Sequence, residues 1–392
     1  MVESGAGVTI AHEGVASQSE AGSGHALSWL MVSGLVYALI SAVSVIGTGF
    51  KVAAGDQAQQ LFQFASNPFV GLMVGIIATA LIQSSSTVSS VIVGLVAGGL
   101  AVPVAVPMIM GANIGTTVTN TLVSLGHVQH RDEFRRAFAA ATVHDFFNLL
   151  AVAIFLPLEM IFGLLERSAL AVSTLVVGPG SYSMSGMNVM AVLTGPMTGS
   201  IEWLAHLLPG VFAGVAMIVI GITLIFVSIR FIGRLLKVLM VGRAKRIMHG
   251  AIGRGPWSGI LSGTVVTVLV QSSSTTTSLM VPLAGSGAFT LSQIYPFTLG
   301  TNVGTTITAL LAATAVSGAL AAHALEIALV HVLFNVFALV LIFTLPFLRN
   351  IPMLGAEWLA ALAAQRKLFA AVWVLGVFVV MPGLLILVTS VL

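Results

Sequence analysis

The sequence predicts an all-α polytopic membrane protein with two repeats of inverted topology. Three observations support this fold class: the composition, the distribution of charge between apolar segments, and a set of duplicated polar motifs. Of the 392 residues, 57% are hydrophobic and 7% are charged, and the mean hydropathy is +1.08. A soluble protein carries about 25% charged residues. This chain therefore has too few charges to cover a surface in water.

The apolar segments fall into two kinds. A helix needs about 20 apolar residues to cross a bilayer. Two stretches, 69–100 and 257–288, are apolar but are interrupted by polar clusters and glycines. They predict re-entrant hairpins or broken helices, which are tolerated only where protein or a cavity surrounds the backbone. The uninterrupted candidates for transmembrane helices are 27–50, 104–125, 134–160, 207–230, 292–314, 322–346 and 368–391.

These segments also predict how the chain is divided. Residues 1–26 are polar and rich in Gly and Ser, so we expect a disordered cytoplasmic tail rather than a cleaved signal peptide. The remaining divisions are a first repeat at 27–160, an external connecting loop at 161–206, a second repeat at 207–349, and a C-terminal segment at 350–392 with the last transmembrane helix.

The positions of lysine and arginine predict the orientation. Of the 15 Lys and Arg residues, all except Lys51 and Arg167 fall in segments that this topology places on one side. The positive-inside rule assigns that side to the cytoplasm. Segment 230–254 is basic without a single acid, and we interpret it as a solvated loop next to anionic lipid. Nucleic acid is not an expected partner. The first broken hairpin then enters from outside and the second from the cytoplasm.

Three polar motifs recur in the same order in the two halves. Paired broken segments in an inverted repeat point to the midplane binding site of a secondary transporter. The pairs are QSSST at 83–87 and 271–275, GANIGTT at 111–117 with GTNVGTT at 300–306, and HDFFN at 144–148 with HVLFN at 331–335.

The duplicated motifs have the chemistry of an ion site. A helix broken inside the membrane leaves backbone N–H groups that, with the helix dipole, bind anions. Hydroxyl and amide side chains donate to an anion and also offer oxygens to a hard cation such as sodium. A single Ser or Thr would more often serve helix packing. Because five consecutive polar residues are duplicated, we interpret them as a binding site built from both halves.

His144 and Asp145 lie near the start of a predicted span. Ionisable residues inside a membrane are energetically unfavourable and often functional. The pair could act as a proton relay or coupling-ion ligand, or it could be a buried hydrogen-bonded pair that orients the neighbouring span. Only the histidine recurs, at His331, since Val332 replaces the aspartate. Both interpretations stay open.

Enzymatic motifs are absent from the chain. It has no nucleophile elbow, no P-loop and no His-Glu-x-x-His. Without cysteine, neither a disulfide nor a Cys-ligated metal site is possible. We therefore expect no enzyme and no transition metal, and no sequence feature specifies an oligomeric state.

The motifs resemble those of the type II sodium-dependent phosphate cotransporters, the solute carrier family 34 and its bacterial relatives. The paired QSSST and GANIGTT/GTNVGTT segments carry this resemblance, above all with EFRRAFAAATVHDFFN at 133–148, and it covers about 27–346. It implies sodium-driven uptake of inorganic phosphate by alternating access, with no cofactor besides the coupling ion. A sodium-coupled carrier of another oxyanion or a dicarboxylate is the alternative, and a hydroxyl-lined ion channel is a further one.

The resemblance also implies ligands. It assigns Gln271, Thr301, Thr305 and Thr308 to sodium, and we add Gln83 and Ser274 to that set. For phosphate we expect Ser84, Ser85, Asn113, Thr116, Ser272, Ser273 and Asn302.

One segment departs from the animal members of that family. They carry a long glycosylated, disulfide-bearing external loop between the repeats, whereas 161–206 is short and has neither a cysteine nor a glycosylation sequon. This indicates a bacterial protein of the inner membrane. The animal members also keep both termini inside, whereas the present topology places the C-terminus outside.

Overall fold

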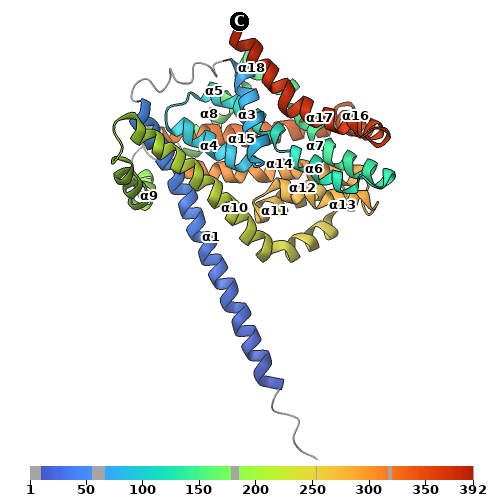
Figure 1. The fold of residues 1–392 in the computed structure, drawn as a ribbon, viewed down its shortest axis with the longest axis horizontal. Coiled ribbons are helices and arrows are strands. Elements are labelled where there is room, and N and C mark those ends of the chain that lie inside the picture. Colours follow the sequence, from blue (N-terminus) through green and yellow to red (C-terminus); the bar gives the residue numbers. More distant parts are fainter. Residues whose placement is uncertain (1–9, 55–66, 178–184, 253, 317–319, 392) are drawn as a thin grey trace, which may run out of the picture.

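The computed structural model describes residues 10–54, 67–177, 185–252, 254–316 and 320–391, and every regular element in these ranges is helical (Figure 1). The helices are α1 (Ile10–Ala54), α3 (Pro68–Ile82), α4 (Ser85–Ala97), α5 (Val102–Gly115), α6 (Val118–Ser124), η3 (Leu125–His127), α7 (Arg131–Phe162), α8 (Leu164–Val177), α9 (Ser185–Ala205), α10 (Val211–Ala251), α11 (Pro256–Val270), α12 (Ser273–Ser278), α13 (Met280–Gly285), α14 (Leu291–Thr314), α15 (Ala321–Thr344), α16 (Pro346–Gln365), α17 (Leu368–Leu375), η4 (Gly376–Val380) and α18 (Met381–Val391).

The prediction of an all-α polytopic membrane protein is confirmed. Within the described residues, six helical segments are long and apolar enough to cross a membrane. Helix α14 was also expected to span, but it is not among them, because its many threonines lower its hydropathy. The six are Leu27–Ala53, Val102–His127, Arg131–Phe162, Val211–Leu239, Ala321–Thr344 and Leu368–Val388.

Both apolar stretches that carry QSSST are broken at the glutamine. Gln83 ends α3 with φ 56°, and Gln271 ends α11 with φ 54°. The next residue then begins a new helix, because the hydroxyls of Ser84 and Ser272 each accept a hydrogen bond from a backbone N–H three residues on, at 3.2 and 3.1 Å. Serine is a strong N-cap. The Gln-Ser step thus ends one helix and begins the next in both halves.

Each broken hairpin is packed tightly against the helix that carries the second motif. Helix α3 contacts α5 through Gly75 and Gly111, and α11 contacts α14 through Gly263 and Gly300. A Cβ on any of these glycines would overlap a backbone carbonyl of the facing helix. Small residues of this kind let membrane helices approach closely. These contacts therefore fix the position of each QSSST break along its partner helix.

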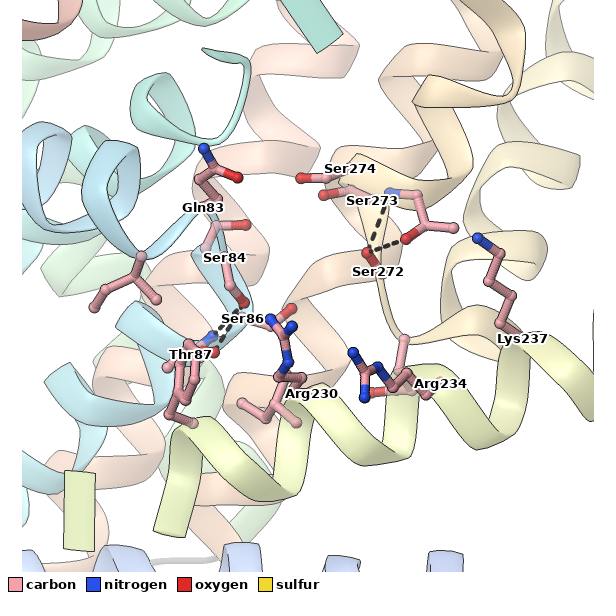
Figure 2. Close-up of a pocket in the computed structure, with 17 residues that line it drawn as sticks. Gln83, Ser84, Ser86, Thr87, Arg230, Arg234, Lys237, Ser272, Ser273 and Ser274 are labelled. Carbon is pink, nitrogen blue, oxygen red and sulfur yellow. Dashed lines mark hydrogen bonds between the residues drawn. The ribbon is translucent and has the colours of Figure 1, made fainter. Parts of the chain in front are cut away.

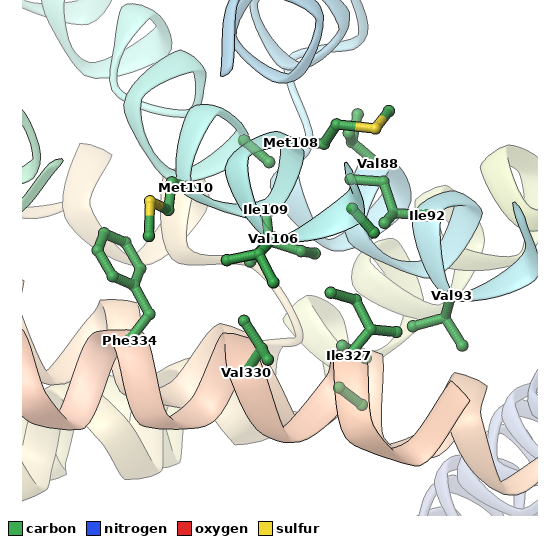
Figure 3. Packing of buried hydrophobic residues seen from close by; sticks show 14 of the residues in the cluster. Val88, Ile92, Val93, Val106, Met108, Ile109, Met110, Ile327, Val330 and Phe334 are labelled. Carbon is green, nitrogen blue, oxygen red and sulfur yellow. The ribbon is translucent and has the colours of Figure 1, made fainter. Parts of the chain in front are cut away.

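The main apolar core fixes the first break from the other side. Val88 and Ile92 of α4 pack into a cluster with Val106 of α5 and Ile327 and Val330 of α15 (Figure 3). All five side chains are buried. Helix α4 contacts both α5 and α15, so the serines at its N-terminus have a defined position.

Three expected boundaries differ from the structure. The connecting segment 161–206, expected as an external loop, contains α8 and α9. Helix α1 begins at Ile10, so residues 10–26 are helical rather than disordered, and residues 1–9 lie outside the described part. Segment 230–254 is mostly the end of α10 rather than a loop, because α10 continues to Ala251.

The C-terminal segment 350–392 contains more than the last transmembrane helix. Helix α16 packs along α7 and buries Leu359, Ala360 and Ala363 against Phe134 and Phe138. The apolar stretch that follows is interrupted by the π-helical turn η4 between α17 and α18. Figure 1 shows α16 to α18 at one edge of the helical body.

Candidate functional site

The two QSSST breaks line one cavity of about 340 Å³. Figure 2 shows Gln83 and Ser84 on one side and Ser272, Ser273 and Ser274 on the other. The predicted site residues at the cavity wall are Gln83, Ser84, Ser85, Gln271, Ser272, Ser273 and Ser274. Seventeen residues form this wall, and ten of them belong to the two motifs. Residues almost 190 positions apart in the chain therefore share one site.

A third wall of the cavity is basic. Arg230, Arg234 and Lys237 of α10 line it together with the serines (Figure 2). Their spacing of four and three residues places them on one face of the helix. We expected these residues in a solvated loop next to anionic lipid; their side chains are exposed, but they lie on a helix instead of a loop and line the cavity. The helical spacing was the signal in the sequence that could have identified them.

The side chains of the cavity wall are suited to binding an anion. Its wall carries three cations and no Asp or Glu. Serine hydroxyls can donate hydrogen bonds, and arginine forms short, charge-assisted bonds to oxyanions. The N-terminus of α4, which begins at Ser85, adds the positive end of a helix dipole. Together these groups favour a small, multiply charged oxyanion with several acceptor oxygens.

Thr308 and Thr116 lie behind this wall and contact hydroxyl and amide groups of the wall itself. Thr308 of α14 donates to Oε1 of Gln271 at 3.0 Å and lies 3.5 Å from Oγ of Ser86. Thr116 and Ser274 lie 3.4 Å apart through their hydroxyl oxygens. The contacts of Thr308 with Ser86 and of Thr116 with Ser274 join elements of the first half to elements of the second. Neutral oxygens gathered in this way are the ligands that a hard cation prefers.

Two other predicted sodium ligands, Thr301 and Thr305, are buried in α14 and donate to carbonyl oxygens one turn earlier, Thr298 at 2.7 Å and Asn302 at 2.6 Å. Their lone pairs stay available to a cation, since a hydroxyl accepts as well as donates. Neither residue lies at the cavity wall.

The predicted phosphate ligands Asn113 and Asn302 lie in a buried amide network instead of the cavity wall. The Asn302 amide donates to Oδ1 of Asn148 at 2.8 Å, and its own Oδ1 is bonded to His144. The Asn148 amide donates to the backbone carbonyl of Asn113 at 2.7 Å. This network connects α5, α7 and α14. Both groups of the Asn302 side chain are used inside the protein, so it does not point at the cavity.

Asp145 of α7 is buried and does not line the cavity. One of its carboxylate oxygens accepts a hydrogen bond from the indole N–H of Trp373 at 2.7 Å, and the other has no partner within the described residues. The stacked rings of Phe146 and Trp373, 4.8 Å apart, reinforce this contact between α7 and α17. His144 and Asp145 are thus both buried and hydrogen-bonded, each to a different helix.

The described residues contain no group of three or more His, Asp or Glu side chains that could hold a metal ion. Oxygen ligands for a cation would therefore come from hydroxyl, amide and backbone groups. Residues of the QSSST motifs and α14 supply such oxygens within reach of one another.

Comparison with known proteins identifies related chains. The model of the family described as Na+/Pi-cotransporter matches residues 38–234 and 224–351. The chain is 30% identical to sodium-dependent phosphate transport protein 2B of Pongo abelii over 90% of the chain and 64% of the relative. It is 32% identical to sodium-dependent phosphate transport protein 2A of Rattus norvegicus over 90% of the chain and 66% of the relative. The chain thus spans a little under two thirds of the length of the first of these relatives. No solved structure matches it.

Proposed function

The chain belongs to the Na+/Pi-cotransporter family, and on this premise we propose that it is a secondary active transporter that couples inward movement of sodium to uptake of inorganic phosphate by alternating access. The relatives are named as transport proteins rather than enzymes. The proposal extends their sodium and phosphate dependence to this chain.

One observation carries the proposal: the two QSSST breaks and the α10 cations line a single cavity. A phosphate carrier needs hydrogen-bond donors and positive charge for its substrate, and a sodium-coupled one also needs oxygens nearby for the cation. The cavity wall supplies the donors, and Gln271 of the wall together with Thr308 behind it supplies the oxygens.

For phosphate we propose Ser84, Ser85, Ser272 and Ser273, assisted by Arg230 and Arg234. All of them line the cavity. Asn113, Thr116 and Asn302 would then support the site from behind, because Thr116 and Asn302 contact other elements through their side chains and Asn113 accepts from α7 through its backbone carbonyl.

For sodium we propose a cluster around Gln271 and Thr308, whose polar side chains are 3.0 Å apart. Gln83, Ser274, Thr301 and Thr305 complete the proposed set. Ser274 reaches Thr116 across the two halves, and the hydroxyls of Thr301 and Thr305 keep their acceptor capacity on the same helix as Thr308.

Alternating access would use the two broken hairpins. In the proposed inverted repeat, each hairpin moves with the helix that its glycines lock to it, α3 with α5 and α11 with α14. His144 and Asp145 could couple such movement to the ion, because His144 bonds Asn302 of α14 and Asp145 bonds Trp373 of α17. Their hydrogen bonds support a bracing role equally well.

We further propose that the protein resides in a bacterial inner membrane. The segment 161–206 has neither cysteine nor a glycosylation sequon, in contrast to the external loop of the animal transporters. The lipid bilayer is then its immediate environment, and the basic end of α10 faces the cytoplasm.

The decisive experiment is uptake of radiolabelled phosphate into proteoliposomes. An inward sodium gradient should drive concentrative uptake, and replacement of sodium by potassium should abolish it. The variants Ser84→Ala and Ser272→Ala should lower uptake. Ser90→Ala is a matched control on α4, because its hydroxyl donates only to the carbonyl of Ser86 and lies outside the cavity wall. Uptake that is indifferent to sodium would refute the coupling.

Competition assays test the substrate. Arsenate should compete with phosphate because of its similar shape and charge, whereas excess sulfate or succinate should not. Strong inhibition by sulfate or succinate would favour the carrier of another oxyanion or of a dicarboxylate. Currents that persist without substrate and do not saturate would indicate a channel.

A further inference from the structure

A second cavity, of about 310 Å³, lies where the first turns of α11, α14 and α16 meet the end of α15. None of its lining residues belongs to the QSSST cavity. Its wall is mostly apolar and includes Pro256, Pro296, Phe343 and Met353. The polar side chains that matter for its chemistry are Tyr295 and Arg349.

The hydroxyl of Tyr295 has no hydrogen-bond partner within the described residues, although the side chain is 1% exposed. A buried polar group without a partner is unfavourable, and native proteins rarely leave one. Tyr295 belongs to the cavity wall, and its hydroxyl is covered in the described conformation. A ligand in the cavity reaches this donor once the side chains over it move aside.

Arg349 is partly buried at the same cavity and lies within electrostatic range of Tyr295. Its guanidinium lies 5.5 Å from the centre of the Phe343 ring. Neither of the ion pairs formed among the described residues involves Arg349. The cavity therefore combines a cation that has no carboxylate partner with an unpaired hydroxyl donor.

The cavity lies at the edge of the membrane. The span Ala321–Thr344 ends five residues before Arg349, and α11 begins at Pro256 directly after the basic end of α10. Two exposed aromatic residues lie next to lining residues in the chain: Trp257, which follows Pro256, is 61% exposed, and Phe347, two residues before Arg349, is 67% exposed. Aromatic rings of this kind lie at the level of lipid headgroups. The basic segments on this side are those that the positive-inside rule assigns to the cytoplasm.

We propose that this cavity binds an anionic phospholipid of the cytoplasmic leaflet. The lipid phosphate accepts a hydrogen bond from Arg349 and, after the side chains over Tyr295 move aside, a second one from the Tyr295 hydroxyl, which satisfies the buried donor. The beginning of an acyl chain lies against Pro256, Pro296 and Met353. Basic pockets between transmembrane helices on the cytoplasmic side suit lipid headgroups. Free inorganic phosphate would leave the apolar wall uncovered, and a zwitterionic lipid would place a second cation next to Arg349.

The test uses purified full-length protein in detergent and a photoreactive phosphatidylglycerol with a diazirine on its acyl chain. After irradiation and digestion, mass spectrometry should locate crosslinks in the first turns of α11 and α16. Unlabelled phosphatidylglycerol should compete about tenfold better than phosphatidylcholine, because the interaction is a charge-assisted hydrogen bond. Millimolar inorganic phosphate should not compete. This readout does not depend on transport, so it can fail while the proposed function stands, and the reverse also holds.

Variants of Arg349 and Tyr295 test whether the crosslinks depend on these two polar side chains. Arg349→Gln should abolish them, and Tyr295→Phe, which keeps the ring, should weaken phosphatidylglycerol competition several-fold. Arg366→Gln is the matched control, because Arg366 follows the other end of α16 and does not line the cavity. Crosslinks that are unchanged in Arg349→Gln, equal competition by the two lipids, or displacement by inorganic phosphate would each overturn the proposal.

Discussion

Replacement of each glutamine at the helix breaks by glycine separates the backbone role of the QSSST motif from its side-chain role. Gln83 and Gln271 both adopt left-handed backbone conformations, with φ of 56° and 54°. That conformation costs a residue with a Cβ about 1–2 kcal/mol. Glycine avoids this cost but loses about 0.5–1 kcal/mol more conformational entropy on folding. The two backbone effects nearly cancel, so Gln83→Gly should change the unfolding free energy by less than about 1 kcal/mol.

Gln271→Gly should be clearly more destabilising. The Gln271 amide donates to the carbonyl of Val268 at 2.8 Å, and its Oε1 accepts from Thr308 at 3.0 Å. Gln83 is exposed and makes neither contact, and the hydroxyl of Thr119, which corresponds to Thr308, has no partner in the described structure. Each hydrogen bond contributes about 1 kcal/mol net. We therefore expect a difference of about 2 kcal/mol between the two variants.

Unfolding of both variants in mixed detergent and SDS micelles measures this difference. The double variant Gln271→Gly/Thr308→Val should be about 1 kcal/mol less destabilised than the sum of the single variants, because the shared bond is lost only once. In proteoliposomes, Gln271→Gly should also raise the sodium concentration for half-maximal uptake. Equal destabilisation at the two positions, or an unchanged sodium activation curve, would refute the reasoning.

Three further predictions concern packing, charge and the buried carboxylate. Gly300→Ala should sharply lower thermal stability and expression, because its methyl group would overlap the Ile260 carbonyl, whereas Gly34→Ala, with no atom within 4 Å, should behave as wild type in the same melting assay. Arg234→Gln should raise the KM for phosphate about tenfold in uptake assays, through loss of a charge-assisted bond, with sodium activation little changed. Trp373→Phe should destabilise the protein by about 1–3 kcal/mol in SDS titration, since it removes the 2.7 Å bond to the buried carboxylate of Asp145 and keeps the ring.

Much of the architecture could be predicted from the sequence because its physical signals are local. Long apolar runs predicted an all-α membrane protein, and the duplicated QSSST clusters marked two segments that cannot continue as one helix. Serine at the second motif position is a strong N-cap, so the sequence itself indicates where the second helix begins. The resemblance to a phosphate cotransporter family is confirmed by the family match over residues 38–234 and 224–351.

The rest depended on tertiary structure. Arg230 and Arg234 were assigned to a solvated loop because segment 230–254 is basic without a single acid, although α10 continues there to Ala251. Only packing of α10 against α11 and the α4 region brings these cations to the serines. Asn302 was expected at the substrate, yet its amide is bonded to Asn148. A sequence shows that a polar side chain is buried in a membrane, but not which partner it has.

The glycine contacts between α11 and α14, and between α3 and α5, also have a mechanical consequence. Helices that touch through their backbones cannot slide past one another without steric overlap, so each pair should behave as one stiff rod. Deformation would then concentrate where side chains alone separate the elements, at the 3.4 Å contact of Thr116 with Ser274 and the 3.5 Å contact of Thr308 with Ser86. The proposed ion site would then lie at the interface along which the two helix pairs move. Binding of an ion by these side chains would be coupled directly to the movement of one helix pair relative to the other.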